Sequence, residues 1–302
     1  MTLICCTLWG SAFPCVKTGY RLFSIASEDM AGQLLFAGVR FAMAGVLVIL
    51  FGSIGAHTFL RPKKESLRMI AGLSLVQTVG QYFFFYIGLA HASGVSGSII
   101  EAASSFFAIL VAALIFRTET LNSRKIIGCL IGFAGVLLIQ LPGSSLDLHM
   151  RLNGEGFVTI STLMYAFSSS MIKRFSARED TVVLSGYQFF GGGLVLAAVG
   201  ALMGGRLTGF TPASTALLLY MALISAVAYT LWSILLKYNP VSRIAIFGFI
   251  NPVMGVLMSA FFLGEQNQAF SIYGLLALAL VSAGIIVVNR PGATPSVNRP
   301  YT

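Results

Sequence analysis

FFAILVAALIFRTE at Phe106–Glu119 and PVMGVLMSAFFLGE at Pro252–Glu265 align without a gap at an offset of 146 residues, in a chain of 302. Each segment belongs to a longer apolar region, Gly94–Leu141 in the first case and Pro240–Val288 in the second. Similarity at a fixed spacing indicates an internal repeat, which has to be recognised before the rest of the fold is predicted. Because the offset is close to half the chain length, the sequence predicts a protein built by duplication.

The composition excludes an ordinary soluble domain. Hydrophobic residues make up 57% of the chain and charged residues 10%, whereas soluble domains carry about 25% charged residues. The sequence contains apolar runs of roughly 18–24 residues, and a helix of that length crosses a hydrocarbon core of roughly 30 Å. We therefore predict an all-α polytopic membrane protein with ten transmembrane helices and only short loops. The predicted spans are residues 2–20, 34–54, 67–90, 94–116, 124–141, 155–174, 184–204, 213–236, 241–263 and 270–289.

The cationic residues predict the orientation of the chain. The first apolar run lacks the basic region and cleavage site of a signal peptide, so we expect a retained helix. With a cytoplasmic N-terminus, fourteen of the 19 Lys and Arg residues lie on the cytoplasmic side, four on the other side, and Arg40 lies inside a span. This bias places both termini in the cytoplasm. It also accounts for the formal net charge of +9 without a nucleic-acid partner. The four residues expected outside are Lys17, Arg21, Arg151 and Arg206.

The two copies are expected to have opposite orientations in the membrane. Each copy contains five spans, an odd number, so the second copy enters the bilayer from the other side. Such inverted repeats are typical of secondary transporters, in which two similar halves move about a site near the bilayer midplane. We assign residues 1–141 to the first repeat, 155–289 to the second and 290–302 to a cytoplasmic tail. Trp9 matches Tyr165 at an offset of 156, and Arg40 matches Gln188 at 148.

Four motifs carry a resemblance to a known family. They are LWGSAFPCVK at 8–17, VRFAMAG at 39–45, AYTLWSILLK at 228–237 and NPVMGVLMSAFFLGE at 251–265. In order and spacing the chain resembles the drug/metabolite transporter superfamily, specifically its exporters built from two EamA domains, over residues 1–289. The resemblance implies a ten-helix fold with cytoplasmic termini and a central cavity lined mainly by spans 1, 3, 4, 6, 8 and 9. It also implies export of small metabolites, often amino acids or related solutes.

Glu101 is the strongest candidate for a functional residue. It lies about seven residues into the fourth span, roughly 10 Å below the outer boundary at 1.5 Å per residue. An ionisable group at that depth costs several kcal/mol unless it is compensated, so it marks a functional site by default. We expect Gln81 and Tyr82 at nearly the same depth, where the three residues would bind an amine or exchange a proton. The alternative is a structural hydrogen bond, or an ion pair with Arg40.

Two further polar residues of the spans have both a functional and a structural interpretation. Gln77 and Gln81 are spaced i, i+4 and are expected to share one face of the third span, where they either line the cavity or join helices. For Arg40, structural packing is the favoured interpretation, because its long side chain can extend toward the outer interface.

Aromatic residues near the middle of spans are further candidates for the cavity wall. They would suit a cavity that holds organic solutes by stacking or by cation–π contacts. Packing in the core or against lipid is the alternative. These residues are Trp9, Tyr165, Tyr229 and Trp232.

Two prolines are candidate hinges. Pro252, which follows the cavity candidate Asn251, and Pro14 in the first span remove helix hydrogen bonds, and such breaks lie beside sites in transporters. As tolerated kinks they would have no function. The resembled family often carries proline in both closing helices, and here Phe106 occupies the position equivalent to Pro252. The hinge of the first copy is therefore in question.

The remaining features indicate structure and exclude other classes of function. Glu119 and Glu265 are expected to cap the helices that follow them. Cys5, Cys6, Cys15 and Cys129 lie inside spans, and we interpret them as small packing residues. The sequence shows no catalytic constellation, metal-ligand spacing or cofactor motif, so we expect no enzyme and no cofactor.

The sequence therefore predicts a secondary transporter of the plasma (inner) membrane. We expect it to export a small organic solute, amino-acid-like, cationic or zwitterionic, by alternating access, with Glu101 as the candidate for proton coupling. A passive channel or facilitator, and a non-transporting receptor, are the alternatives. The lipid bilayer and the solute are the expected partners. The sequence does not distinguish a monomer from a homodimer.

Overall fold

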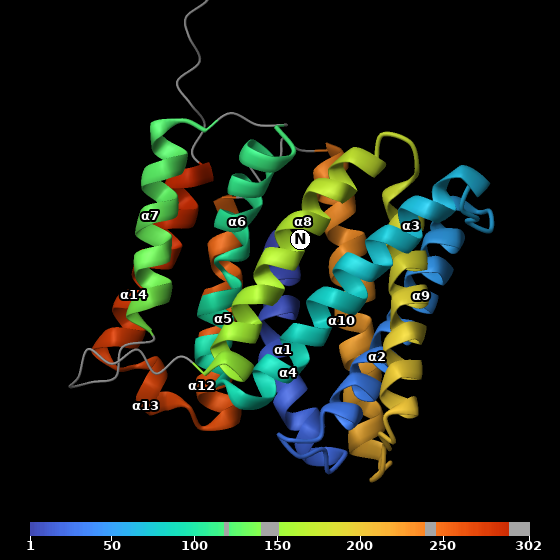
Figure 1. The fold of residues 1–302 in the computed structure, drawn as a ribbon, viewed down its shortest axis with the longest axis horizontal. Coiled ribbons are helices and arrows are strands. Elements are labelled where there is room, and N and C mark those ends of the chain that lie inside the picture. Colours follow the sequence, from blue (N-terminus) through green and yellow to red (C-terminus); the bar gives the residue numbers. More distant parts are fainter. Residues whose placement is uncertain (118–120, 140–150, 239–245, 290–302) are drawn as a thin grey trace, which may run out of the picture.

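The computed structural model describes residues 1–117, 121–139, 151–238 and 246–289. Within these ranges every regular element is a helix (Figure 1). The α-helices are α1 (Thr2–Leu22), α2 (Met30–Ala56), α3 (Leu67–Leu73), α4 (Tyr82–His91), α5 (Gly94–Glu101), α6 (Ser104–Leu110), α7 (Ser123–Leu138), α8 (Phe157–Phe175), α9 (Thr181–Leu202), α10 (Pro212–Tyr238), α12 (Ile250–Leu263), α13 (Gln266–Ala269) and α14 (Ile272–Asn289). The short 3₁₀ segments are η1 (Lys64–Ser66) and η5 (Ile246–Phe249), and the π-helical segments are η2 (Ser74–Gln81), η3 (Val111–Ile115) and η4 (Leu152–Gly156). Glu119, the end of the first repeat at residue 141 and the tail 290–302 lie outside the described residues.

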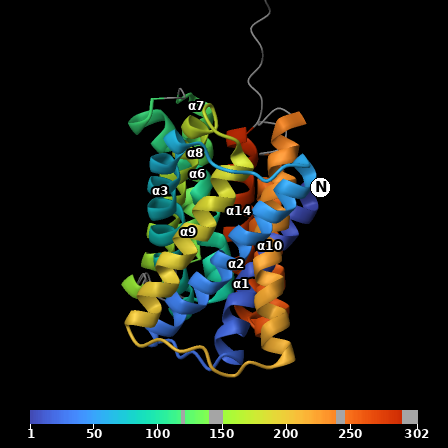
Figure 2. The ribbon, with the colours of Figure 1, turned by 90° about the vertical axis from the view of Figure 1, so that its right-hand side faces the viewer.

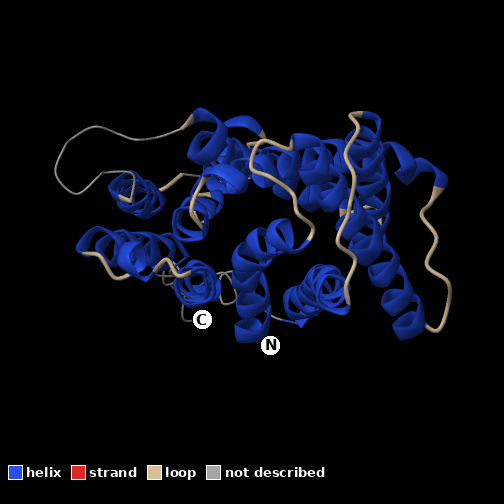
Figure 3. Ribbon diagram, turned by 90° about the horizontal axis from the view of Figure 1, so that it is seen from below, coloured by secondary structure: helices blue, strands red, loops and turns tan. Residues whose placement is uncertain are grey.

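The length and composition of the helices identify a polytopic membrane protein. Among the described residues, six helices are long and apolar enough to cross a bilayer: Met30–Ala56, Lys64–His91, Gly94–Ile115, Thr181–Leu202, Pro212–Trp232 and Ile272–Asn289. Phe247–Leu263 is a shorter apolar helix. The helices run roughly side by side in one bundle, as the end-on view of Figure 3 shows. The count of ten spans stays a prediction.

The connecting loops gather at the two ends of the bundle (Figures 1 and 2). At one end the Lys63 Nζ donates to the carbonyl oxygen of Arg178 at 3.1 Å, so the loops after α2 and after α8 lie together. At the opposite end the ring of Phe23 contacts that of Phe210, with centroids 5.2 Å apart, which joins the loops after α1 and after α9. This sorting is the one expected if consecutive helices cross the membrane in alternating directions.

Glycines allow equivalent helices of the two copies to pack closely. A Cβ atom on Gly38 of α2 would overlap the backbone nitrogen of Ala197 on α9, and one on Gly193 would overlap that of Ala42. The same holds between α7 and α14, where a Cβ on Gly128 would lie 2.9 Å from the carbonyl oxygen of Gly284. Small residues that let helix backbones approach are the usual means of association in a bilayer. The second and fifth predicted spans therefore pack on their repeat-related partners.

The helix breaks fall beside the interior rather than at the predicted hinge Pro14. Helix α1 continues through Pro14, which is buried. The first copy breaks between α5 and α6 without a proline, directly after Glu101, where the N–H of Ala103 bonds to the carbonyl of Ile100 at 2.9 Å. Phe106, at the position of Pro252, therefore does not keep this span regular. Pro252 itself is the third residue of α12 and follows shortly after the 3₁₀ segment η5, which ends at Phe249.

The expectation that Glu265 caps the helix after it is wrong. Its Oε1 accepts a hydrogen bond from the backbone N–H of Gly94 at 3.0 Å, and its Oε2 accepts one from Val95 at 2.8 Å. Glu265 therefore caps the N-terminus of α5, which belongs to the other copy. A second bond supports this connection, because Gln268 Nε2 donates to Ser96 Oγ at 2.9 Å. The loop after α12 in the second copy is thus joined to a broken span of the first.

Candidate functional site

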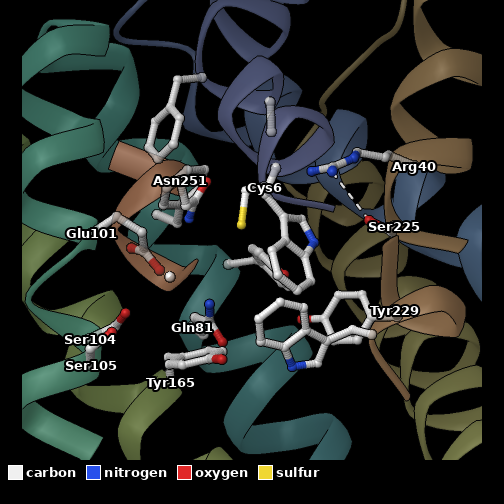
Figure 4. Close-up of a pocket in the computed structure, with 17 residues that line it drawn as sticks. Cys6, Arg40, Gln81, Glu101, Ser104, Ser105, Tyr165, Ser225, Tyr229 and Asn251 are labelled. Carbon is white, nitrogen blue, oxygen red and sulfur yellow. Dashed lines mark hydrogen bonds between the residues drawn. The ribbon is translucent and has the colours of Figure 1, made fainter. Parts of the chain in front are cut away.

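A cavity of about 220 Å³ lies inside the bundle (Figure 4). It is bounded by residues from α1, α2, η2, α4, α5, α6, α8, α10, η5 and α12, so both copies contribute to its wall. Eight of the nine residues predicted from the sequence line it: Trp9, Gln81, Tyr82, Glu101, Tyr165, Tyr229, Trp232 and Asn251. Trp9 and Tyr165, which the repeat matches to each other, thus lie in the same cavity wall. The role of these residues in binding stays a prediction.

Gln77 is the predicted residue that the structure does not place in the cavity wall. It is buried, 1% exposed, in the π-helical segment η2. Residues four apart on a helix share a face but lie about one turn apart along its axis. Of the two glutamines, Gln81 alone lines the cavity, so a shared face does not place Gln77 at the depth of the cavity.

Glu101 is the carboxylate in the cavity wall. It ends α5 at the helix break, so its backbone lies at the point where the span changes course. Between described residues its side chain makes one hydrogen bond, a long one of 3.5 Å from Ser161 Oγ. The same hydroxyl lies 2.7 Å from the carbonyl oxygen of Val158. A serine hydroxyl has a single proton to donate, and the shorter contact takes it. Glu101 is thus left almost without a hydrogen-bond donor among the described residues.

Two amide oxygens accompany Glu101. Asn251 Oδ1 and Gln81 Oε1 are buried, and neither has a hydrogen-bond partner among the described residues. Both side chains line the cavity. Leaving a buried acceptor unpaired costs about 1–3 kcal/mol, and the cost disappears if a ligand supplies the donor. Together with the Glu101 carboxylate these oxygens form a set of acceptors suited to an ammonium group.

Arg40 is buried in the cavity wall instead of extending toward the outer interface as expected. It is 4% exposed. Its Nη1 donates to Tyr86 Oη at 2.6 Å, its Nη2 to Ser225 Oγ at 3.2 Å and its Nε to the carbonyl oxygen of Met221 at 3.1 Å. The ion pair between Arg40 and Glu101 that the sequence left open is not formed. Sequence reasoning missed Arg40 because its depth alone does not show which way the side chain points.

Aromatic rings form one wall of the cavity. The Trp9 ring packs edge-on against Trp232 at 5.1 Å and against Tyr229 at 5.8 Å between centroids. Tyr82 stacks on Phe41 at 3.9 Å, which fixes the tyrosine ring from behind. The side chains hold one another in place, so their faces form a preformed surface for an organic solute.

Another lining residue, Cys6, could have been found from its spacing. Cys6 precedes Trp9 by three residues in α1, and residues three or four apart on one helix share a face. Ser104 and Ser105 also line the cavity, but they lie beyond the helix break that follows Glu101, so this rule does not find them. The interpretation of Cys6 as a packing residue is incomplete, because it lines the cavity as well.

A partly polar cavity enclosed by membrane helices defines the class of a solute transporter. A family model described as the EamA-like transporter family matches residues 1–141 and 152–290. The chain therefore belongs to this family, within the drug/metabolite transporter superfamily, and is a multi-pass membrane transporter. The family match covers both copies of the repeat.

Individual relatives cover nearly the whole chain. A probable terminal-alkyne amino-acid exporter of Streptantibioticus cattleyicolor is 25% identical and covers 93% of this chain and 90% of its own length. A probable amino-acid metabolite efflux pump of Salmonella typhimurium is 24% identical, with 95% and 93% covered. One solved crystal structure superposes with a TM-score of 0.63 at 17% identity, covering 95% of this chain and 94% of the other. The last comparison shows a shared fold.

Proposed function

We propose that the protein is a secondary active exporter of small, amino-acid-like organic solutes that are cationic or zwitterionic. It contains ten spans, arranged as two inverted five-helix repeats at residues 1–141 and 155–289, with both termini in the cytoplasm of a cell whose plasma membrane it crosses. It moves solute by alternating access, in which the cavity opens to one side of the membrane at a time.

The observation that carries the proposal is the state of Glu101. A carboxylate inside a membrane protein needs compensation, and the one hydroxyl that is hydrogen-bonded to Glu101 among the described residues donates its proton to Val158. A solute ammonium, or a proton in the absence of solute, provides that compensation. The same group therefore serves both binding and coupling: solute and proton compete for Glu101, which links their movements.

The names of two relatives support the substrate class. One is described as a probable amino-acid exporter and the other as a probable amino-acid metabolite efflux pump. An amino-acid-like solute matches the chemistry of this cavity, because it combines an ammonium group for Glu101 with a body that packs against the ring of Trp9 and its neighbours.

The connections between the copies support movement about the cavity. Glu265 joins the outer-end loop of the second copy to α5 through two backbone hydrogen bonds. A break at Ala102–Ala103 divides one span next to the cavity, and in another the 3₁₀ segment η5 changes to the α-helix α12 shortly before Pro252. Outward opening then requires the Glu265 contacts to break, while the glycine-packed helix pairs α2–α9 and α7–α14 stay together.

Transport by purified protein in liposomes tests the proposal. We expect saturable uptake and counterflow of a labelled amino acid, a rate that responds to an imposed pH gradient, and loss of both in Glu101→Gln. Glu28→Gln is the control, because it removes a carboxylate outside the cavity whose side chain is 83% exposed. Normal flux and an unchanged pH response in Glu101→Gln would end the coupling role. Rapid ohmic conductance would refute a carrier.

A further inference from the structure

Arg40 is a buried cation whose partners are all neutral. Its three hydrogen bonds go to a tyrosine hydroxyl, a serine hydroxyl and a backbone carbonyl. Among the described residues the one ion pair joins His91 and Glu28, at an end of the bundle. A guanidinium has five N–H donors, so the three bonds leave two for another partner. Burying a charge without a counter-charge is costly, and the guanidinium lines the cavity (Figure 4).

The repeat provides an internal control for the role of this position. Gln188 matches Arg40 in the second copy and is also buried, 1% exposed. Its Oε1 accepts a hydrogen bond from Thr78 Oγ1, and its carbonyl oxygen accepts one from Ser74 Oγ at 3.2 Å. A neutral amide thus satisfies the packing of a repeat-related position, outside the cavity wall. Of these two repeat-related positions, the one in the cavity wall is therefore the one that carries a charge.

The charges of the cavity lie on opposite sides. In Figure 4, Arg40 and Ser225 occupy one side and Glu101 with Asn251 the other. The donors of the first pair suit a carboxylate, and the acceptors of the second suit an ammonium. Trp9, Phe13 and Tyr229 also line the space, so its wall offers apolar surface in addition to these polar groups.

We propose that Arg40 is a specificity-determining residue that binds a carboxylate of the solute, while Glu101 binds an ammonium at its other end. The substrate class is thereby narrowed to bipolar solutes, such as ω-amino acids or amino acids with a cationic side chain, whose charges are separated by an apolar spacer. This inference rests on the proposed function and deepens it, because an exporter of simple amines would need Glu101 without Arg40.

Four probe molecules of similar length distinguish binding of a carboxylate by Arg40 from binding of an ammonium by Glu101. ε-Aminocaproate carries both charges at opposite ends, caproate has the carboxylate alone, cadaverine has two ammonium groups, and norleucine has both charges at one end. Binding is measured by calorimetry in detergent and flux in liposomes. We expect the wild type to bind ε-aminocaproate most tightly. Arg40→Gln should weaken it roughly 10- to 100-fold, since a hydrogen-bonded charge contributes that much.

The response of the other probes distinguishes binding from structural support. Arg40→Gln should strengthen cadaverine binding, because a like charge is removed from its second ammonium, whereas Glu101→Gln should weaken cadaverine and spare caproate. Arg40→Lys keeps the positive charge but lacks the planar guanidinium that can donate two parallel hydrogen bonds to a carboxylate. It should therefore retain a reduced preference for ε-aminocaproate over cadaverine. If Arg40→Gln does not fold, Arg40→Lys still tests whether residue 40 binds the solute carboxylate.

Three results would overturn the inference. They are an equal loss for every probe in Arg40→Gln, an unchanged preference for ε-aminocaproate in both Arg40 variants, and tighter wild-type binding of norleucine than of ε-aminocaproate. Saturable flux of cadaverine that is independent of Arg40 would leave the exporter standing and remove the carboxylate site alone. Absence of flux for amino acids and probes alike would refute the proposed function and this inference with it.

Discussion

Glu265 offers a direct test of how the two copies are held together. Its carboxylate accepts hydrogen bonds from the backbone N–H groups of Gly94 and Val95, at 3.0 and 2.8 Å. These groups belong to the first two residues of α5 and have no hydrogen-bond acceptor within their own helix. Replacing Glu265 by alanine therefore removes a cap, a charge at the favourable end of a helix dipole, and a link between loops 171 residues apart in sequence.

The magnitude follows from the number and type of bonds. A hydrogen bond to a charged group contributes about 1.5–3 kcal/mol, and the half-buried position of Glu265 places each bond at the low end. Glu265→Ala should therefore cost about 2–4 kcal/mol of unfolding free energy. Glu265→Gln keeps one acceptor oxygen without the charge, so it should cost about half as much.

Thermal unfolding in detergent measures the effect. We expect the midpoint to fall in the order wild type, Glu265→Gln, Glu265→Ala, by about 4–8 °C for the alanine variant. Glu28→Gln is the matched control, since it removes a carboxylate at the same end whose side chain is 83% exposed. If Glu265→Ala unfolds at the same temperature as this control, the cap between the copies does not stabilise the fold.

Two further predictions concern packing and pH. Gly193→Ala should lower the unfolding free energy by about 1–3 kcal/mol, because the added Cβ would overlap the backbone of Ala42. Gly191→Ala is the control: its added Cβ would lie 3.7 Å from its nearest neighbour, so the same thermal assay should show almost no change. Burial raises the pKa of Glu179, but hydrogen bonds from the backbone N–H of Lys63 and other donors outweigh it, so the pKa lies below the ordinary 4.5. The stabilisation is then present at neutral pH and is lost as the pH falls below about 4.5, so Glu179→Gln should be less stable than wild type at pH 7 and equal to it in acid. A gap that persists in acid would contradict this.

Eight of the seventeen residues in the cavity wall could be predicted, because polar and aromatic residues are conspicuous in the middle of apolar spans. Glu101, Trp9 and Asn251 attract attention for that reason, and all three line the cavity. Periodicity did not suffice at Gln77, because a shared face with Gln81 does not show which turn of the helix meets the cavity. How far the cavity extends along a helix depends on the packed neighbouring helices, which a single sequence does not reveal.

Two features could not be predicted from the sequence: the direction in which the long side chain of Arg40 points, and the long-range hydrogen-bond partner of Glu265. Arg40 has the length to reach the interface or the interior, and only the packed positions of Tyr86 and Ser225 decide for the interior. The partner of Glu265 lies in the other copy, so it is defined only after the halves dock. Helix-capping rules favour a local partner, and here the tertiary contact prevailed.

The departures from repeat symmetry have a physical reason. An exact two-fold cavity would carry two guanidinium groups and two carboxylates, so every site for an ammonium would be matched by a second one across the axis. A solute with one positive and one negative end needs one pole of each sign, which requires symmetry to be broken at both positions. The chain breaks it there: Arg40 matches Gln188, and Glu101 matches Phe247. The glycines of α2 and α9, which serve packing alone, occur in both copies at the contact between them. In the proposed transporter, symmetry is therefore kept where helices pack closely, and it is lost where a bipolar solute would be oriented.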